Sequence, residues 1–377
     1  MKNVRFIALY LPQFHPIPEN DEHWGKGFTE WTNVGKAKPL FKGHYQPKVP
    51  ADLGYYDLRM PEIREEQALL AKEAGIEGFC YWHYWFGNGK RLLDMPLNNI
   101  LSLGKPEFPF CLCWANHSWS NKTWKKDLSR KEANTMIAEQ KYLGIEDYKM
   151  HFQALLPALK DKRYIHVDGK PIFFVWDPMV EQMADFINVW RDLAKNNGLK
   201  GIHFVGMLYT ASLKSNLSVE ERIKKVLDIG FDAVNTIGNT KAELECNKLK
   251  SYFGAFVNKY LHIGKITKYK QDDINKHMFC DEDVKENVYP TIMPNWDRSP
   301  RAGKDCVIYT DSTPEVFERS VENVIKLVKD KTPQHQIVTI RSWNEWGEGN
   351  YLEPCLKYGH GYLDALKKAV NKVSKEK

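Results

Sequence analysis

The stretch Ile337-Val338-Thr339-Ile340-Arg341-Ser342-Trp343 shows most clearly how the chain is built. A short apolar run that leads into polar and glycine-rich sequence is typical of a strand buried on both faces of a parallel sheet. Seven further runs of this kind precede it along the chain. The eight expected strands are 4–11, 78–85, 109–116, 171–176, 202–208, 233–236, 288–295 and 337–343.

Helical patterns separate most of these runs, at 61–74, 146–159, 180–196, 218–227 and 314–329, and a basic helix is expected at 361–377. Strands that alternate with helices in this way predict a single (β/α)8 TIM-type barrel over residues 1–377, with long loops after the strands. The region 241–287 is rich in Lys, Asn and Asp and breaks the alternation. We interpret it as an insertion between strands six and seven.

Composition excludes several classes of protein. The net charge is only +6, and the lysines are scattered, so the sequence does not indicate a nucleic-acid-binding protein. The pair Cys111 and Cys113 with His117 has no standard zinc spacing, and no glycine-rich phosphate loop is present. We therefore expect neither a metal nor a cofactor.

The chain also lacks the marks of export. No run reaches the roughly 18 apolar residues of a membrane span. The N-terminal run contains Tyr10 and continues into Pro12-Gln13-Phe14-His15, which is a first strand rather than a signal peptide. The seven cysteines are unevenly spaced, as in reduced intracellular proteins. We expect a cytoplasmic location.

Two carboxylates three positions apart, Glu345 and Glu348, follow the last strand among tryptophans and glycines. Residues three apart on a strand point to opposite faces, so both can face one cavity only if the strand ends and the chain turns. Gly347 and Gly349 permit such a turn. Paired acids walled by aromatic rings indicate a site that handles sugars. The alternative is structural, with one glutamate capping a helix and the other paired with a lysine.

The chemistry of a barrel lies at the carboxyl ends of its strands. Nearly every expected strand end here supplies an aromatic ring or a hydrogen-bonding group, which indicates a carbohydrate site. Alternation along the second strand favours Trp82 and Tyr84 over His83 and Trp85 for the barrel mouth. The substrate-binding candidates are Tyr10, His15, Glu30, Trp31, Trp82, Tyr84, Trp114, Asn116, His117, Trp176, Asn235, Trp296, Asn344 and Trp346.

Four motifs together resemble one group of proteins. They are Tyr10-Leu11-Pro12-Gln13-Phe14-His15, Gly27-Phe28-Thr29-Glu30-Trp31, Gly78-Phe79-Cys80-Tyr81-Trp82-His83-Tyr84 and Trp343-Asn344-Glu345-Trp346-Gly347-Glu348. The chain resembles the WbsX-like proteins, a group related to glycoside hydrolase family 99, the endo-α-mannosidases and endo-α-mannanases. The resemblance covers essentially the whole chain. It implies a barrel that acts on α-mannose-like linkages of bacterial surface polysaccharide, with retention of configuration and no metal.

The resemblance also implies roles for the two catalytic candidates. Glu345 would act as a base on the 2-hydroxyl of the sugar, and Glu348 would protonate the leaving oxygen and later activate the acceptor. Glu348 would then need a raised pKa, which neighbouring tryptophans would supply by desolvation. Glu345 should stay ionised beside polar neighbours such as Asn344.

Three other functions stay open. The first is a glycosyltransferase or transglycosidase in O-antigen, lipopolysaccharide or capsule biosynthesis, which a cytoplasmic location favours. The second is a catalytically silent protein that binds an oligosaccharide or polysaccharide. The third is a weak association of the basic stretch 248–270 with anionic lipid at a membrane surface, for which a solvated helix face is the alternative.

Overall fold

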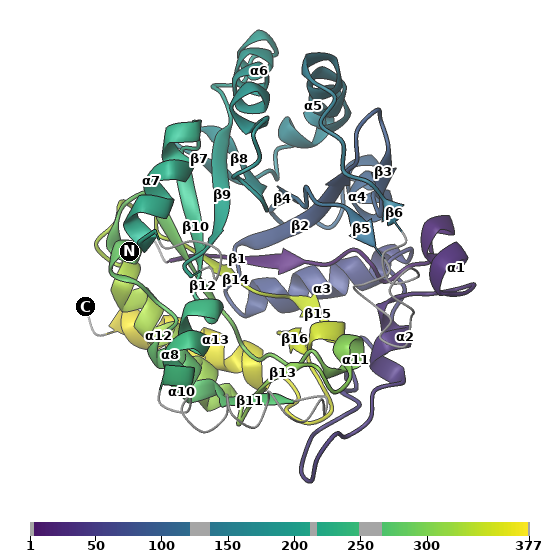
Figure 1. Cartoon of the computed structure of the whole chain (residues 1–377), viewed down its shortest axis with the longest axis vertical. Helices are drawn as coiled ribbons and strands as arrows, with labels where there is room; N and C mark the ends of the chain where they lie inside the picture. The colour runs from purple at the N-terminus through teal and green to yellow at the C-terminus, as the bar shows by residue number, and fades with distance from the viewer. Residues whose placement is uncertain (1–3, 121–135, 212–216, 249–265, 376–377) are drawn as a thin grey trace, which may run out of the picture.

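Eight parallel strands close into a barrel (Figure 1). The computed structural model describes residues 4–120, 136–211, 217–248 and 266–375. The first strand pairs with both the second and the last, which closes the sheet and confirms the predicted (β/α)8 fold. The barrel strands are β1 (Arg5–Tyr10), β2 (Gly78–Trp85), β4 (Phe110–Trp114), β8 (Lys170–Val175), β9 (His203–Tyr209), β10 (Ala233–Ile237), β12 (Val288–Ile292) and β14 (Ile337–Ile340).

The barrel strands are buried on both faces, as their apolar sequences predict. Every residue of β4, β10, β12 and β14 is buried. The closing pairs run in register, from Arg5 opposite Ile337 to Ala8 opposite Ile340. Strands three, seven and eight end earlier than expected, so the residues that follow Ile292 and Ile340 are free to leave the sheet.

Helices cover the outside of the barrel, and their starts follow local sequence rules. Ser218 and Glu221 form a capping box at the start of α7, and Thr313 caps α12 ahead of Pro314. The helix α4 was not predicted, because it is short and two asparagines interrupt its apolar pattern. The helices are α3 (Pro61–Glu73), α4 (Met95–Leu103), α5 (Ile145–Leu159), α6 (Met183–Asn196), α7 (Val219–Ile229), α12 (Pro314–Val328) and α13 (Gly361–Lys375).

The described part of region 241–287 lies between β10 and β12. It comprises most of α8 (Asn239–Lys248), then β11 (Thr267–Lys270), α10 (Gln271–Lys276) and the 3-10 helix η3 (Asp281–Val284). The strand β11 pairs with β13 (Val307–Thr310), which follows β12. These elements form a second small core that includes Met278, Tyr309 and Trp296. Most of the basic stretch 248–270 falls outside the described residues.

Short elements gather at the end of the barrel toward which β1 points (Figure 1). The short strand β7 (His166–Val167) is not one of these elements, because it forms a hairpin with the start of β8. None of the helices among the described residues is long and apolar enough to cross a membrane. The elements near the carboxyl ends are α1 (Pro18–Trp24), α2 (Glu30–Gly35), β3 (Arg91–Leu92), β5 (Trp119–Ser120), β6 (Met136–Ala138), α11 (Ser299–Ala302), β15 (Asn344–Glu345), η4 (Trp346–Glu348) and β16 (Asn350–Tyr351).

Candidate active site

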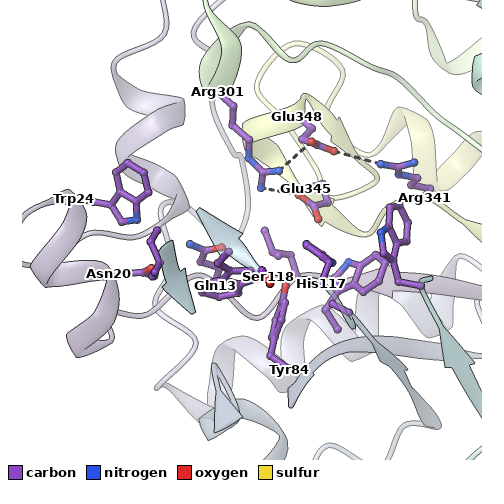
Figure 2. Close-up of a pocket in the computed structure, with 16 residues that line it drawn as sticks. Gln13, Asn20, Trp24, Tyr84, His117, Ser118, Arg301, Arg341, Glu345 and Glu348 are labelled. Carbon is purple, nitrogen blue, oxygen red and sulfur yellow. Dashed lines mark hydrogen bonds and ion pairs between the residues drawn. The ribbon is translucent and has the colours of Figure 1, made fainter. Parts of the chain in front are cut away.

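A cavity of about 190 Å³ lies at the carboxyl ends of the strands (Figure 2). Its wall combines indole rings, two arginines and the two glutamates of the last loop. Asn20 and Trp24 of α1 stand at one end of it (Figure 2). The lining residues are Leu11, Gln13, Asn20, Trp24, Trp82, Tyr84, Ala115, His117, Ser118, Trp119, Ile137, Trp176, Arg301, Arg341, Glu345 and Glu348.

A tight turn brings Glu345 and Glu348 to the same cavity. Glu345 ends β15, Glu348 ends the 3-10 turn η4, and β16 then runs back antiparallel to β15. Gly349 has a φ of 54°, which favours glycine. A Cβ at Gly347 would overlap the carboxylate of Glu30, so glycine is needed for this close approach. The turn predicted from the glycines is therefore present.

Three arginines surround the glutamates. Arg301 of α11 lies 2.8 Å from Glu345 and 3.1 Å from Glu348. Arg298 Nε and Arg341 Nη2 lie 3.4 and 3.6 Å from the Glu348 carboxylate. Figure 2 shows Arg301 and Arg341 on opposite sides of Glu348. The cluster contains three cationic side chains from two loops, and sequence reasoning identified none of them.

Glu30 orients Arg301 from behind. Its side chain is fully buried, and its two carboxylate oxygens accept hydrogen bonds from Arg301 Nε and Nη2 at 3.0 and 2.9 Å. Such a bidentate pair fixes the guanidinium plane. Glu30 therefore does not line the cavity, as was expected, but positions an arginine that does.

The arginines make the two catalytic candidates differ in protonation. Burial, together with the charges of Glu348 and Glu30, raises the pKa of Glu345 to about 7, against the lowering effect of Arg301. The pKa of Glu348 is lowered, because Arg301, Arg341 and Arg298 outweigh its burial. The expected order, with Glu348 protonated and Glu345 ionised, is therefore wrong for this structure. Asn344 does not assist Glu345 either, since its amide bonds the backbone of Leu11.

Aromatic residues predicted from the strand ends form one wall. The rings of Trp82 and Trp176 meet edge to face at 5.4 Å, and both are half-buried. Tyr84 packs against Trp119, and His117 lies beside Trp176. The indole nitrogen of Trp82 has no hydrogen-bond partner among the described residues. This wall offers apolar faces and a spare donor, as a sugar requires.

The alternation predicted along β2 is also present. Trp82 and Tyr84 line the cavity. His83 and Trp85 instead contact His151 and Asp147 of α5, at 2.8 and 3.2 Å. Their burial against a helix explains why they do not reach the cavity.

Other predicted residues lie in the core instead of the cavity. The Tyr10 hydroxyl donates to Gln67, and His15 is buried away from the cavity. Trp114 donates to the carbonyl of Trp85. Tyr10 and Trp114 end their strands with side chains directed at the surrounding helices, against Gln67 of α3 and Phe186 of α6.

Three candidates near other strand ends, two asparagines and one tryptophan, also bond or pack against neighbouring residues inside the protein. Asn116 bonds the backbone of Asp177 in both directions at 2.8 Å. Asn235 donates to Tyr289 and to two threonines inside the barrel. Trp296 packs against Tyr309 and under the guanidinium of Arg341. None of the three lines the cavity.

The aromatic residues of the last loop face inward. Trp346 is fully buried, stacks on Tyr351 at 3.8 Å and donates to Glu353. Trp31 lies 5.6 Å from it and donates to the carbonyl of Tyr56. The expectation that these two rings contact substrate is therefore corrected, since both support the loop from below.

Sequence reasoning missed several residues of the cavity. Arg341 directly follows β14, and Arg301 lies nine residues after β12, so their positions after strand ends were the available signal. Asn20 and Trp24 come from α1, a short helix that the sequence did not reveal. Among the described residues, no group of three or more His, Cys, Asp and Glu side chains is arranged to hold a metal ion.

Comparisons with known proteins agree with this architecture. The family described as Glycosyltransferase WbsX matches residues 6–366. The protein WxcX of two Xanthomonas campestris pv. campestris strains is 32% identical over 374 residues, which is 97% of this chain and 50% of WxcX. The chain thus spans about half the length of these curated relatives.

Solved structures resemble the chain over nearly its whole length. A glycoside hydrolase-like protein aligns with a TM-score of 0.61 and 15% identity, over 98% of this chain and 94% of that one. The GH99 endo-α-mannosidase from Bacteroides thetaiotaomicron, in complex with Bis-Tris propane, aligns with a TM-score of 0.56 and 13% identity, over 100% and 98%. At these identities the likeness shows the fold alone.

Proposed function

The chain belongs to the WbsX glycosyltransferase family, and we propose that it is an enzyme that acts on α-glycosidic linkages of a bacterial surface polysaccharide. Glu345 and Glu348 are the proposed catalytic residues. Trp82, Tyr84, His117 and Trp176 are the proposed sugar contacts. An α-mannose-like sugar is the first candidate, because the fold is shared with the GH99 endo-α-mannosidase.

One observation carries this proposal: two buried carboxylates, whose pKa values their surroundings shift in opposite directions, line one indole-walled cavity. Glycosidic chemistry needs one group that gives a proton and one that takes it. With a pKa of about 7, Glu345 holds a proton up to neutrality, whereas Glu348 is ionised. We assign proton donation to Glu345 and activation of the acceptor hydroxyl to Glu348, which reverses the roles that the resemblance implied.

Transfer to a sugar hydroxyl is favoured over hydrolysis. The family is described as a glycosyltransferase, although the barrel is that of glycoside hydrolases. The sequence has no glycine-rich nucleotide-binding motif, which fits a donor other than a nucleotide sugar. A transglycosidase in polysaccharide assembly meets both observations, and a cytoplasmic location is part of the same proposal.

The test is turnover of α-glycosyl fluorides, with α-mannosyl fluoride first, in the presence and absence of sugar acceptors. We expect fluoride release that is lost in Glu348→Gln, which lacks the proposed base, and coupled products by mass spectrometry when an acceptor is present. Free sugar as the sole product would make the protein a hydrolase. Binding of the sugars without turnover of any fluoride would instead indicate a glycan-binding protein and contradict the proposal.

A further inference from the structure

Arg341 presents unused hydrogen-bonding capacity to the cavity. Its guanidinium lies over the rings of Trp296 and Trp176, at 4.9 and 5.7 Å from their centroids, and its side chain is 10% exposed. A guanidinium has five N–H donors. Here Nη1 donates to the Tyr209 hydroxyl at 3.0 Å, and no other hydrogen bond links the group to a described residue. Glu348, at 3.6 Å, is too far for a good hydrogen bond.

The carboxylates of the cluster are bonded mainly to Arg301 and not to Arg341. Glu30 and Glu345 both accept hydrogen bonds from Arg301 Nη2, and Glu348 lies 3.1 Å from Arg301 Nη1. Arg341 is only 10% exposed, and its ion-pair partner among the described residues is Glu348 at 3.6 Å. An anion in the cavity would therefore find paired N–H groups of Arg341 available to it.

From this geometry we propose that the donor substrate is a glycosyl phosphate, and that Arg341 binds its phosphate beside the reacting carbon, next to the positive charge of Arg301. This inference rests on the proposed function. Both arginines line the same cavity as the two glutamates and the indoles of Trp82 and Trp176. Arginine matches phosphate oxygens with paired N–H groups, so the Arg341 side chain suits that anion.

The reaction balances with a hydroxyl acceptor. The bond between the anomeric carbon and the phosphate oxygen breaks, and its electron pair leaves with the phosphate, whose charge the arginines stabilise. The acceptor oxygen bonds to the anomeric carbon, and its proton passes to Glu348 and then to the released phosphate or to solvent. Phosphate leaves without needing a proton from the enzyme. Because Glu348 is ionised beside the arginines, it has no proton to give to a departing sugar alkoxide. It can accept the proton of the acceptor hydroxyl, which is what this reaction requires.

The experiment compares glycosyl phosphates with glycosyl fluorides of the same sugar, in the manno, gluco and galacto series, with a sugar acceptor. The phosphates are the sugar 1-phosphate, a nucleoside diphosphate sugar and a short prenyl-phosphate sugar, which distinguish free, nucleotide-linked and lipid-linked donors. Initial rates give kcat/KM for wild type, Arg341→Gln, Arg341→Lys and Arg298→Gln. Arg298 is the matched control, because it lies 3.4 Å from Glu348 but does not line the cavity.

We expect turnover of the sugar 1-phosphate or of the prenyl-phosphate sugar, and turnover confined to the nucleoside diphosphate sugar would contradict the donor proposed above. The loss in Arg341→Gln should be about ten-fold larger on the phosphate than on the fluoride, the loss typical of one charge-assisted hydrogen bond. Arg341→Lys should restore part of that difference, and Arg298→Gln should change both substrates by similar factors. Fluoride turnover without phosphate turnover, or equal losses in Arg341→Gln, would overturn the inference and leave the proposed function standing. Silence on all fluorides and phosphates would overturn both.

Discussion

Glu348 and Glu353, five residues apart, show how surroundings rather than burial decide what a carboxyl group does. Both are buried. Glu353 accepts hydrogen bonds from Tyr56, Gln67 and Trp346, all neutral groups, and burial raises its pKa to about 7. Three arginines lower the pKa of Glu348 instead. We therefore interpret Glu353 as a structural support of the loop, and Glu348 as the proposed catalytic residue.

The largest expected effect is the loss of turnover in Glu348→Gln. The amide is nearly isosteric but cannot take a proton, so kcat on an α-glycosyl fluoride should fall by roughly 10²–10⁴-fold. Sugar affinity, measured by isothermal titration calorimetry, should stay within a few-fold. Glu353→Gln is the matched control, and we expect it to keep most of the activity. Equal losses in both variants would remove the distinction between the two glutamates.

A second prediction concerns the pH dependence of stability. Because the pKa of Glu353 rises from 4.5 to about 7 on folding, the folded state keeps a proton that the unfolded chain releases in this range. Its contribution is fully present below about pH 4.5 and is lost as pH rises toward 7 and above. The free energy of unfolding of wild type should therefore fall relative to Glu353→Gln by about 3 kcal/mol between pH 5 and pH 8.

Urea denaturation at the two pH values measures this difference. Glu345, which also has a raised pKa, contributes the same slope to both proteins and cancels in the comparison. A gap between the two proteins that stays constant with pH would show that Glu353 does not titrate in this range.

The smallest effect is expected from Arg298→Gln. Arg298 is 40% exposed and solvent screens its charge, so its removal should raise the pKa of Glu348 only slightly. The acid limb of kcat/KM on the fluoride should move slightly to higher pH. Arg319→Gln, an exposed arginine of α12 paired with Asp272, serves as the control. A limb that does not move, or moves to lower pH, would contradict the role given to Arg298.

The sequence predicted the barrel and the pair of glutamates because both depend on local pattern. Apolar runs mark the strands, and Gly347 and Gly349 mark the turn that brings the acids together. Orientation within irregular segments was not predictable, because strand alternation does not extend into a 3-10 turn. Trp346 therefore points inward, although alternation succeeded for Trp82 and Tyr84 on a regular strand.

The electrostatics of the cavity needed the tertiary structure. Arg298 and Arg301 follow β12, Arg341 follows β14, and Glu30 begins α2, so their contacts join residues up to 271 positions apart. A single sequence does not reveal which of many arginines meet a given carboxylate. The predicted order of the two pKa values was wrong for this reason, since it considered burial by tryptophans and no cations.

The most direct test of the central claim is a crystal structure of Glu348→Gln soaked with α-mannosyl fluoride. The account predicts a sugar ring against the indoles of Trp82 and Trp176, with its anomeric carbon between Glu345 and residue 348. Sugar bound away from this cavity, while the cavity itself contains only water, would contradict the account.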